Sequence, residues 1–365
     1  MSGEGEFRRA RTLILEHGWN ATAYQILNPG IDLWFANAGD GVVGYVRHRR
    51  TLVVAGAPVC AEHRLDDIAT EFVAYARAQG CRICYFGAGD RLESRYAGDP
   101  LWSRVLLGAQ PVWDPREWSD SVARRASLRA QFNRARNKRI AIREWSSADA
   151  ENDPALRKCL TEWLSTRGLP PLHFLVEPET LSSLKDRRIF VAELGTQEVV
   201  AFTVLSPVPA RNGWLVEQIV RGAKAPNGTA ELLIDAAMRA IGESGATYAT
   251  LGLSPLSQRA GISPPPQPLW LRLVLKWVRL HGARFYNFGG LDAFKAKFNP
   301  QAWEPIYAIA EGRSFPPAAL NAIAGAFSGG APTRLVTRAL ASAALEEMAS
   351  AGRKIRVRSR SETRG

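Results

Sequence analysis

Two stretches of the sequence combine residue types that can bind anionic groups. The first is strand-like from Trp214 to Arg221, continues into the loop Gly-Ala-Lys-Ala-Pro-Asn-Gly at 222–228, and then begins a helix-like run at Thr229. Free backbone N–H groups and the positive end of a helix dipole favour a phosphate or carboxylate at such a junction. A plain turn capped by Asn227 or Thr229 is the alternative. The sequence therefore indicates a candidate ligand loop at 222–229.

The second stretch, from Phe285 to Tyr307, is rich in aromatic residues and contains two lysines. Lys295 and Lys297 lie among these aromatics. Removal from water would strengthen the attraction of either ammonium group for an anionic oxygen. The alternative is a pair of surface lysines beside a packed aromatic edge. We interpret this stretch as a second part of an anion-stabilising site.

Several other mechanisms lack the residues that they need. The sequence contains no Gly-x-Ser-x-Gly, no Walker-type phosphate loop, no His-Glu-x-x-His and no His-x-x-x-x-Asp. Cys81 and Cys84 form a Cys-x-x-Cys, but in a predicted strand these positions point to opposite faces, and no second pair completes a zinc site. The five histidines are scattered along the chain. We expect no metal site.

The elements that must position these residues occur in two similar sets. In the first half, a strand pair at 40–48 and 50–55 leads to a helix at 65–79 and a strand at 82–86. In the second half, strands at 189–193, 199–205 and 214–220 lead to a helix at 229–243 and a strand at 247–251. Gly80 and Gly245, which end the two helices, lie 165 positions apart, as do Gly87 and Gly252. This order predicts two copies of one α+β unit.

The length of 365 residues agrees with two domains. We predict an N-terminal module at 1–118, a basic connecting helix at 119–145, a C-terminal catalytic module at 146–311, and an Ala-rich helical and basic tail at 312–365. Cations in the connecting segment are dense: eight Lys and Arg residues and no acid lie between Ser121 and Arg143.

The net charge of +12 comes from this segment and from the C-terminal tail, where six cations follow residue 352. Elsewhere, 33 cations and 34 acids nearly balance. Clustered cations attract nucleic-acid phosphates or anionic lipid headgroups. A solvated helix face and a charged tail are the alternative. The candidate phosphate-binding residues of the segment are Arg129, Arg134, Arg136, Lys138 and Arg139.

A second basic feature follows a proline-rich stretch at 255–268, which we expect to be an irregular loop. In the predicted helix from Leu269 to Leu280, Arg272, Lys276 and Arg279 form one stripe among Leu, Val and Trp residues. This pattern is typical of a helix at a membrane interface, and a core helix with one basic edge is the alternative. No segment has the apolar length of a membrane span, and the N-terminus does not resemble a secretory signal. We expect a cytoplasmic protein associated peripherally with the inner face of the cell membrane.

Five stretches in one order also resemble a known family. The chain is similar, over about residues 15 to 311, to the cytosolic catalytic domain of the phosphatidylglycerol lysyltransferases and alanyltransferases, the multiple peptide resistance factor synthases. The matching stretches are Thr22-Ala-Tyr-Gln-Ile-Leu-Asn28, Thr51-Leu-Val-Val-Ala-Gly-Ala-Pro58, Ala225-Pro-Asn-Gly-Thr-Ala-Glu231, Leu251-Gly-Leu-Ser-Pro-Leu256 and the run from Phe285 to Tyr307. The resemblance implies tandem GNAT-like (acyltransferase) modules, in agreement with the repeat. It also implies transfer of an amino acid from aminoacyl-tRNA to a membrane lipid hydroxyl, with no cofactor besides the tRNA co-substrate.

One site position departs from the family pattern. The family strand usually carries an acidic residue three positions before an arginine; here Arg221 matches, but the acidic position is Gln218, next to Glu217. A missing carboxylate favours a neutral amino acid over lysine, because a second ammonium would need a counter-charge. The sequence also shows none of the polytopic membrane domain of the full-length synthases, so export of the product would need a separate membrane flippase or export protein.

The implied reaction is a transesterification that needs positioning and stabilisation of an oxyanion. We expect Arg221 and Lys295 to stabilise the developing charge and Glu231 or Glu304 to bind the α-ammonium group. The lipid or tRNA phosphates would contact the basic residues of 129–139 together with Arg272, Lys276 and Arg279. The aminoacyl end of the tRNA would contact Glu217, Gln218, Asn227, Gly228, Thr229, Lys297 and Trp303.

Two other functions stay open. A coenzyme-A-dependent N-acyltransferase of the GNAT type would use the 222–229 loop for a pyrophosphate, although that loop has few glycines. A non-catalytic binder of nucleic acid or membrane surfaces would use only the basic segments.

Overall fold

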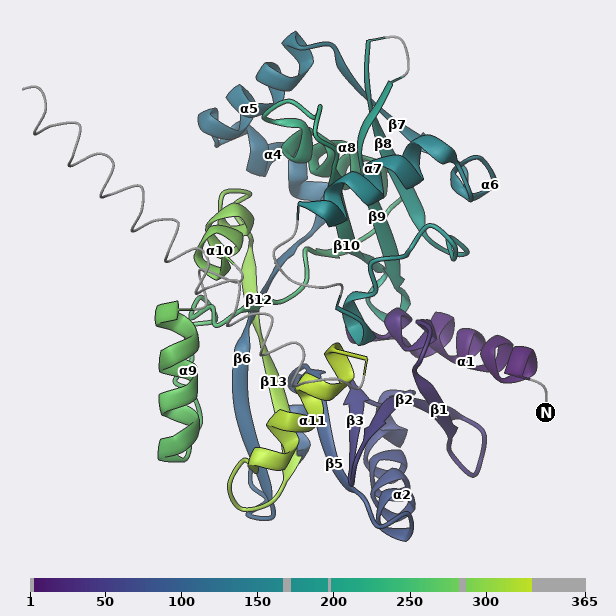
Figure 1. Ribbon diagram of the computed structural model, residues 1–365, viewed down its shortest axis with the longest axis vertical. Helices are drawn as coiled ribbons and strands as arrows, with labels where there is room; N and C mark the ends of the chain where they lie inside the picture. The colour runs from purple at the N-terminus through teal and green to yellow at the C-terminus, as the bar shows by residue number, and fades with distance from the viewer. Residues whose placement is uncertain (1–2, 167–171, 196–197, 282–286, 330–365) are drawn as a thin grey trace, which may run out of the picture.

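Strands from both halves of the chain form one mixed sheet in the computed structural model, which describes residues 3–166, 172–195, 198–281 and 287–329, with no side chains for 277–281. The strand order is β1-β2-β3-β5-β13-β6-β11-β10-β9-β8-β7, with β4 beside β2 and β12 beside β6. Figure 1 shows this sheet passing through both halves, with the long strands β6 and β13 between them.

The N-terminal half contains most of the first predicted set. Its helices and strands are α1 (Gly3–His17), β1 (Asp32–Phe35), β2 (Gly41–His48), β3 (Thr51–Ala55), β4 (Val59–Cys60), α2 (Leu65–Ala78), β5 (Arg82–Ala88), α3 (Asp90–Tyr96) and β6 (Trp102–Trp113). Strands β2 and β3 are antiparallel, and β3 continues through α2 to β5, its parallel neighbour. Apolar residues of α2 at helical spacing, Ile68, Phe72 and Ala76, pack on this part of the sheet.

The C-terminal half repeats this arrangement. Its elements are α6 (Ser147–Ala150), α7 (Pro154–Ser165), β8 (Arg188–Leu194), β9 (Glu198–Val208), β10 (Gly213–Arg221), α8 (Thr229–Glu243), β11 (Tyr248–Thr250), β12 (Ser254–Pro255), α9 (Leu269–His281), α10 (Phe288–Ala296), β13 (Ala302–Glu311) and α11 (Pro317–Phe327). Antiparallel β9 and β10 lead through α8 to β11, which is parallel to β10. The predicted repeat of strand pair, long helix and parallel strand is confirmed.

The two halves exchange their last strands. Strand β6, the last of the N-terminal half, pairs with β11 of the C-terminal half, while β13 pairs with β5 as well as with β6. The predicted C-terminal module at 146–311 thus includes a strand that lies within the N-terminal part of the sheet. This exchange joins both halves through backbone hydrogen bonds.

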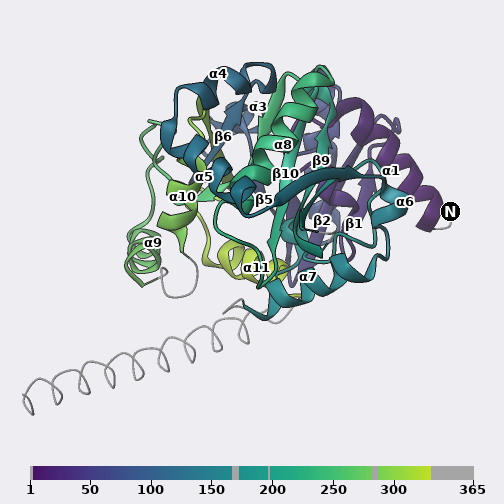
Figure 2. The same cartoon turned by 90° about the horizontal axis from the view of Figure 1, so that it is seen from above.

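The helices cover both faces of the sheet. In the C-terminal half, Phe190 and Ala192 of β8 pack towards α8, while the alternating Ile189 and Val191 pack towards α7. In the N-terminal half, α2 and α3 cover one face, and α1 and α11 pack against the other. The view from above shows α8 lying along β9 and β10 (Figure 2).

The basic connecting segment corrects one expectation. Residues 119–145 are not a single helix: they form most of α4 (Trp118–Ala123), then α5 (Ala126–Asn137) and the edge strand β7 (Ile140–Trp145). Arg125 has non-helical backbone angles between the helices, and Arg139 adopts a left-handed conformation after α5. Pairing with β8 then draws 140–145 into the sheet, where Ile140 is buried. The short apolar pattern of this strand is hidden among the cations that surround it in sequence.

Candidate functional site

A cavity of about 610 Å³ lies between the two halves, where β5 and β11 end. The N-terminal half contributes the segment 19–22 and residues at and after the end of β5, including Gly87, Gly89 and Asp90. The C-terminal half contributes residues 215–219 of β10, the segment 251–253 after β11, and parts of α10 and β13. Apolar side chains dominate its wall, and a small number of charged groups lie among them. Such a composition is typical of a ligand site.

Lys295 is the cation of this cavity that lies deepest in the protein, with 5% of the residue exposed. Helix α10 presents its side chain, and the Nζ atom donates hydrogen bonds to the carbonyl oxygens of Gly252 at 2.8 Å and Leu253 at 2.9 Å. Burial lowers the pKa of Lys295 to about 7, against a smaller opposing effect of the Asp292 charge. Two hydrogen bonds leave one tetrahedral position of Nζ for another group. A lysine that titrates near neutral pH can both accept and donate a proton.

Glu304 also lines the cavity, at the β13 side. Its carboxylate accepts hydrogen bonds from Arg211 Nη1 at 2.9 Å and Nη2 at 2.5 Å, from Gln110 Nε2 at 2.9 Å, and from Tyr248 at 3.3 Å. Burial raises the pKa of Glu304, but the hydrogen bond and charge of Arg211, together with the two other donors, lower it overall. Four donors nearly fill the acceptor capacity of a carboxylate. Glu304 is therefore an ionised part of a closed network.

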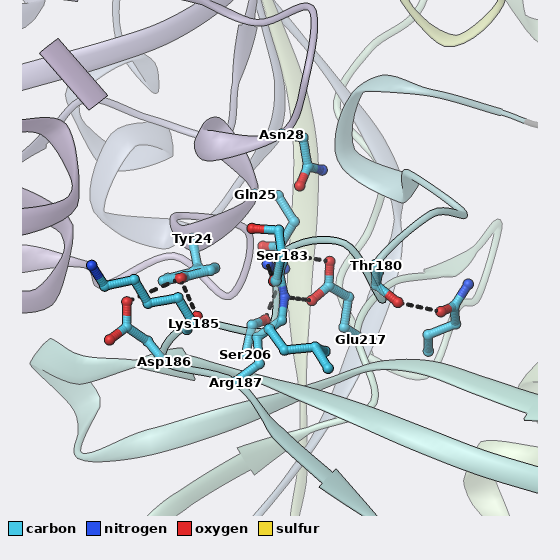
Figure 3. Close-up of polar contacts among 12 residues, drawn as sticks. Tyr24, Gln25, Asn28, Thr180, Ser183, Lys185, Asp186, Arg187, Ser206 and Glu217 are labelled. Atoms are coloured by element: carbon cyan, nitrogen blue, oxygen red, sulfur yellow. Dashed lines mark hydrogen bonds and ion pairs between the residues drawn. The ribbon is translucent and has the colours of Figure 1, made fainter. Parts of the chain in front are cut away.

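Glu217 and Gln218 of β10 line the same cavity, and both have partners; Figure 3 shows Glu217 beside Arg187. Arg187 Nε donates to Glu217 Oε2 at 2.9 Å and Arg187 Nη2 to Oε1 at 3.2 Å, with 3% and 6% of the two side chains exposed. Gln218 accepts from Thr180 Oγ1 at 2.8 Å and donates to the carbonyl of Pro178 at 3.1 Å. The negative charge of Glu217 is therefore compensated inside the protein.

The stretch Thr22–Asn28, quoted above for the family resemblance, joins the two halves beside this pair (Figure 3). The Tyr24 hydroxyl donates to the carbonyl of Lys185 at 2.6 Å and lies 3.0 Å from Asp186, and Arg187 stacks over the Tyr24 ring. The Gln25 amide contacts Ser206 Oγ at 2.8 Å. This segment holds Arg187, and through it Glu217, at the cavity wall.

The other predicted site residues do not belong to the described lining of the cavity. Arg221 is exposed at the end of β10 and donates to the carbonyl of Ala225 at 3.1 Å. It lies two residues beyond the cavity-lining Ile219, so the two share one side of the strand. Lys297 forms an ion pair with Glu231. Trp303 of β13 lies beneath the guanidinium group of Arg259.

The start of α8 is less open than the sequence indicates. Asn227 is exposed, but Gly228 and Thr229 are buried. A Cβ atom at Gly228 would lie 2.4 Å from the carbonyl oxygen of Gln131, so α5 packs directly on this turn. The Thr229 hydroxyl donates to the carbonyl of Pro226 at 2.7 Å. Packing by α5 thus takes up space that an anion at 228–229 would need.

The basic residues predicted to bind phosphates lie on two helices and the turn after one of them. Five cations are exposed on α5 or directly after it: Arg129, Arg134, Arg136, Lys138 and Arg139. On α9, Arg272 and Lys276 are exposed beside Leu269 and Leu273, which are 68% and 58% exposed, while Leu271 is buried. The Arg279 side chain lies outside the described residues. Both surfaces present cations to solvent.

Four charged residues of this region were not found from the sequence: Asp90, Glu177, Arg187 and Arg211. Arg187 and Arg211 compensate Glu217 and Glu304 across 30 and 93 positions, and no local spacing indicates such pairs. Glu177 lines the cavity in a short irregular segment. Among the described residues, no group of three His, Cys, Asp or Glu side chains could hold a metal ion. None of the helices in the described ranges is long and apolar enough to cross a bilayer.

Known proteins are similar to this chain in sequence and in fold. The family model described as phosphatidylglycerol lysyltransferase, C-terminal, matches residues 11–310. The phosphatidylglycerol lysyltransferases of Bacillus subtilis (strain 168) and Staphylococcus aureus (strain MRSA252) are 23% and 25% identical to the chain over 304 residues. These matches cover 82% and 81% of the chain but 34% and 35% of the relatives, so the chain spans about a third of their length.

Two solved structures resemble most of the chain. The C-terminal domain of a putative lysylphosphatidylglycerol synthetase from Agrobacterium fabrum has a TM-score of 0.76 at 23% identity, covering 90% of this chain and 99% of that one. L-PGS from Bacillus licheniformis has a TM-score of 0.73 at 21% identity, covering 91% and 97%. The predicted α+β class with two similar halves is confirmed. The chain belongs to the phosphatidylglycerol lysyltransferase C-terminal family, a family of transferases.

Proposed function

We propose that this chain is an aminoacyltransferase that moves an amino acid from aminoacyl-tRNA to a hydroxyl group of a phosphatidylglycerol-type membrane lipid. Family membership supports the reaction class. The observation that carries the proposal is Lys295, a lysine buried in the wall of an interdomain cavity with its pKa lowered to about 7. Such a group suits a reaction in which one hydroxyl loses a proton and another gains it.

In the proposed step, the lipid hydroxyl oxygen attacks the carbonyl carbon of the aminoacyl ester. The new carbon–oxygen bond forms, the bond to the terminal ribose oxygen of the tRNA breaks, and one ester replaces another. Neutral Lys295 accepts the proton of the lipid hydroxyl and, as an ammonium group, returns it to the leaving ribose oxygen. The charged form also stabilises the oxyanion of the intermediate.

The tRNA would approach across α5. Its exposed cations suit a phosphate backbone, and Arg221, on the same side of β10 as the cavity-lining Ile219, suits a phosphate near the acceptor end. Asn227 is exposed in the loop beyond Arg221. Asn227, Lys297 and Trp303 would contact the same acceptor end of the tRNA. No cofactor enters this scheme, since aminoacyl-tRNA is itself the activated donor.

The lipid would be reached through α9. Leu269 and Leu273 are exposed next to Arg272 and Lys276, a combination that suits acyl chains and anionic headgroups. We propose that the protein acts at the inner face of the cell membrane and that another protein exports the product. We propose that the transferred amino acid has a neutral side chain. Gln218 carries no charge, and the two acids that could supply the missing carboxylate, Glu217 and Glu231, already form ion pairs.

The test is mass spectrometry of the lipids of a bacterial host that expresses the chain, because the host supplies every aminoacyl-tRNA and several acceptor lipids. We expect a new lipid heavier by one amino-acid residue, absent with Lys295→Met and strongly reduced with Arg221→Ala. Removing a positioned group of this kind typically lowers the rate about 100- to 1,000-fold. Substitution of the exposed Lys158, which does not line the cavity, is the matched control. An unchanged lipidome with soluble protein would contradict the proposal, and binding to coenzyme A would then support the N-acyltransferase alternative.

A further inference from the structure

The aminoacyl group of the proposed substrate carries an α-ammonium that must find a carboxylate when it leaves water. Among the described residues, the acids that line the cavity are Asp90, Glu177, Glu217 and Glu304. Their existing partners decide which of them has negative charge to offer. This inference rests on the proposed function, since it concerns the aminoacyl substrate of the same cavity.

Two of the four acids are already compensated by arginine. Glu304 accepts hydrogen bonds from Arg211 at two nitrogens and from two further donors. Glu217 is held by two nitrogens of Arg187, in an ion pair almost fully removed from solvent. Recruiting either carboxylate for a ligand would weaken a buried pair, which is energetically costly.

Glu177 has a different environment. Its side chain is 11% exposed, and Oε2 lies 3.0 Å from Nδ1 of His173, whose own side chain is 46% exposed. The other carboxylate oxygen, Oε1, lies 3.5 Å from the backbone nitrogen of Glu179, a long distance for a hydrogen bond. In the described part of the chain, no Lys or Arg comes within ion-pair distance of it. Among the described residues, Glu177 is therefore a largely buried cavity carboxylate whose one cationic neighbour is His173, which is charged only when it is protonated.

Gln218 holds the segment that carries Glu177 in place by hydrogen bonds. Its amide nitrogen donates to the carbonyl of Pro178, the residue after Glu177, and its amide oxygen accepts from Thr180. Both polar atoms of the neutral amide thus form hydrogen bonds that hold residues 178–180 against β10. This arrangement places a carboxylate from the neighbouring segment at the cavity wall next to a strand position that has none.

Asp90 is the remaining acid, and it is less suited. It is exposed at the start of α3, where its Oδ1 accepts a hydrogen bond from the N–H of Arg91. Water screens an exposed carboxylate, so its attraction for an ammonium group is weaker than that of a largely buried one.

We propose that Glu177 binds the α-ammonium group of the aminoacyl substrate, in place of the Glu231 or Glu304 expected from the sequence. The contact would orient the ester carbonyl relative to Lys295. Because the ammonium is present in the ground state and in the transition state alike, the contact should act mainly on KM for aminoacyl-tRNA.

The test uses the full chain and two hydrolysis-resistant probes: 3′-alanylamino-3′-deoxyadenosine and its desamino counterpart, which lacks the α-ammonium group. Their affinities are measured by isothermal titration calorimetry for the wild type, Glu177→Gln and the control Glu179→Gln. Glutamine keeps an acceptor for His173 and for the Glu179 N–H but removes the charge, and Glu179 is an exposed acid two residues away.

The wild type and Glu179→Gln should prefer the ammonium probe about 10- to 100-fold, the range typical of a hydrogen bond to a charged group. Glu177→Gln should lose this preference while binding the desamino probe as the wild type does. A preference retained in Glu177→Gln, or lost in Asp90→Asn instead, would overturn the assignment. If the wild-type protein produces aminoacylated lipid but shows no preference between the probes, the role of Glu177 is refuted and the proposed function is not. A wild type that binds neither probe and leaves the lipids unchanged would overturn the proposed function as well.

Discussion

Replacing Lys295 by methionine should change how the stability of the protein depends on pH. The pKa of this lysine falls from 10.5 in the unfolded chain to about 7 in the folded protein, mainly through burial. Between these values the unfolded state binds a proton that the folded state does not, so the wild type gains stability as pH rises. The destabilisation is fully present below pH 7 and disappears above pH 10.5.

The magnitude follows from about 1.36 kcal/mol for each pKa unit. The ionisation of Lys295 should cost the folded wild type about 5 kcal/mol at pH 6 and about 2 kcal/mol at pH 9. Methionine has a similar length and no charge. It leaves the carbonyls of Gly252 and Leu253 without their donor, a loss of about 1–3 kcal/mol for each unpaired group that does not vary with pH.

The assay is urea denaturation of both proteins at pH values from 6 to 9. The free energy of unfolding of Lys295→Met minus that of the wild type should become more negative by about 2–3 kcal/mol from pH 6 to pH 9, because only the wild type gains stability. Lys276→Met, at an exposed position of α9, should show no such trend. A difference that is constant with pH would refute the conclusion that Lys295 is buried with a lowered pKa, and with it the proton-transfer role.

Three further changes test other parts of the structure. Arg187→Met leaves Glu217 buried without its partner and should lower the free energy of unfolding by about 3–5 kcal/mol, measured in urea; a loss below 1 kcal/mol would contradict a desolvated pair. Replacing Arg134, Lys138 and Arg139 of the α5 surface by glutamine should weaken tRNA binding and reduce the slope of log affinity against log salt by up to about 3, whereas an unchanged slope would exclude this surface. Leu273→Ser on α9 should reduce sedimentation with phosphatidylglycerol vesicles several-fold, with Leu101→Ser, also exposed but outside α9, as the control; equal binding of both variants would argue against α9.

Many elements follow from local sequence patterns. The helix at 229–243 has the predicted bounds, because apolar residues at helical spacing and a terminal glycine are both local signals. The strands on either side of it and α2 lie within one residue of their predicted bounds at each end. Helix α5 and strand β7, which follow each other closely in sequence, were not predicted as separate elements. The cations of 121–143 mask the change from helical to strand periodicity after Asn137.

The chemistry of the site depended on contacts between distant parts of the chain. Lys295 was identified from its aromatic neighbours in sequence, but its two carbonyl partners and its burial come from packing against the segment after β11. Glu217 and Glu304 are expected from the sequence to contact the aminoacyl group, and each has an arginine partner that no spacing indicates. The backbone amides at 228–229 were expected to be open, and α5 packs against this turn.

Periodicity and composition act over a few residues, so local patterns are enough to predict the repeated α+β unit, its helices and most of its strands, and the candidate lysine. Which charges remain to act on a substrate depends on how distant segments pack. The exchange of β6 and β13 brings both halves to one cavity, and burial there makes each charge depend on its nearest partner in space. Those partners lie tens of residues away, so no local pattern in the sequence can reveal them.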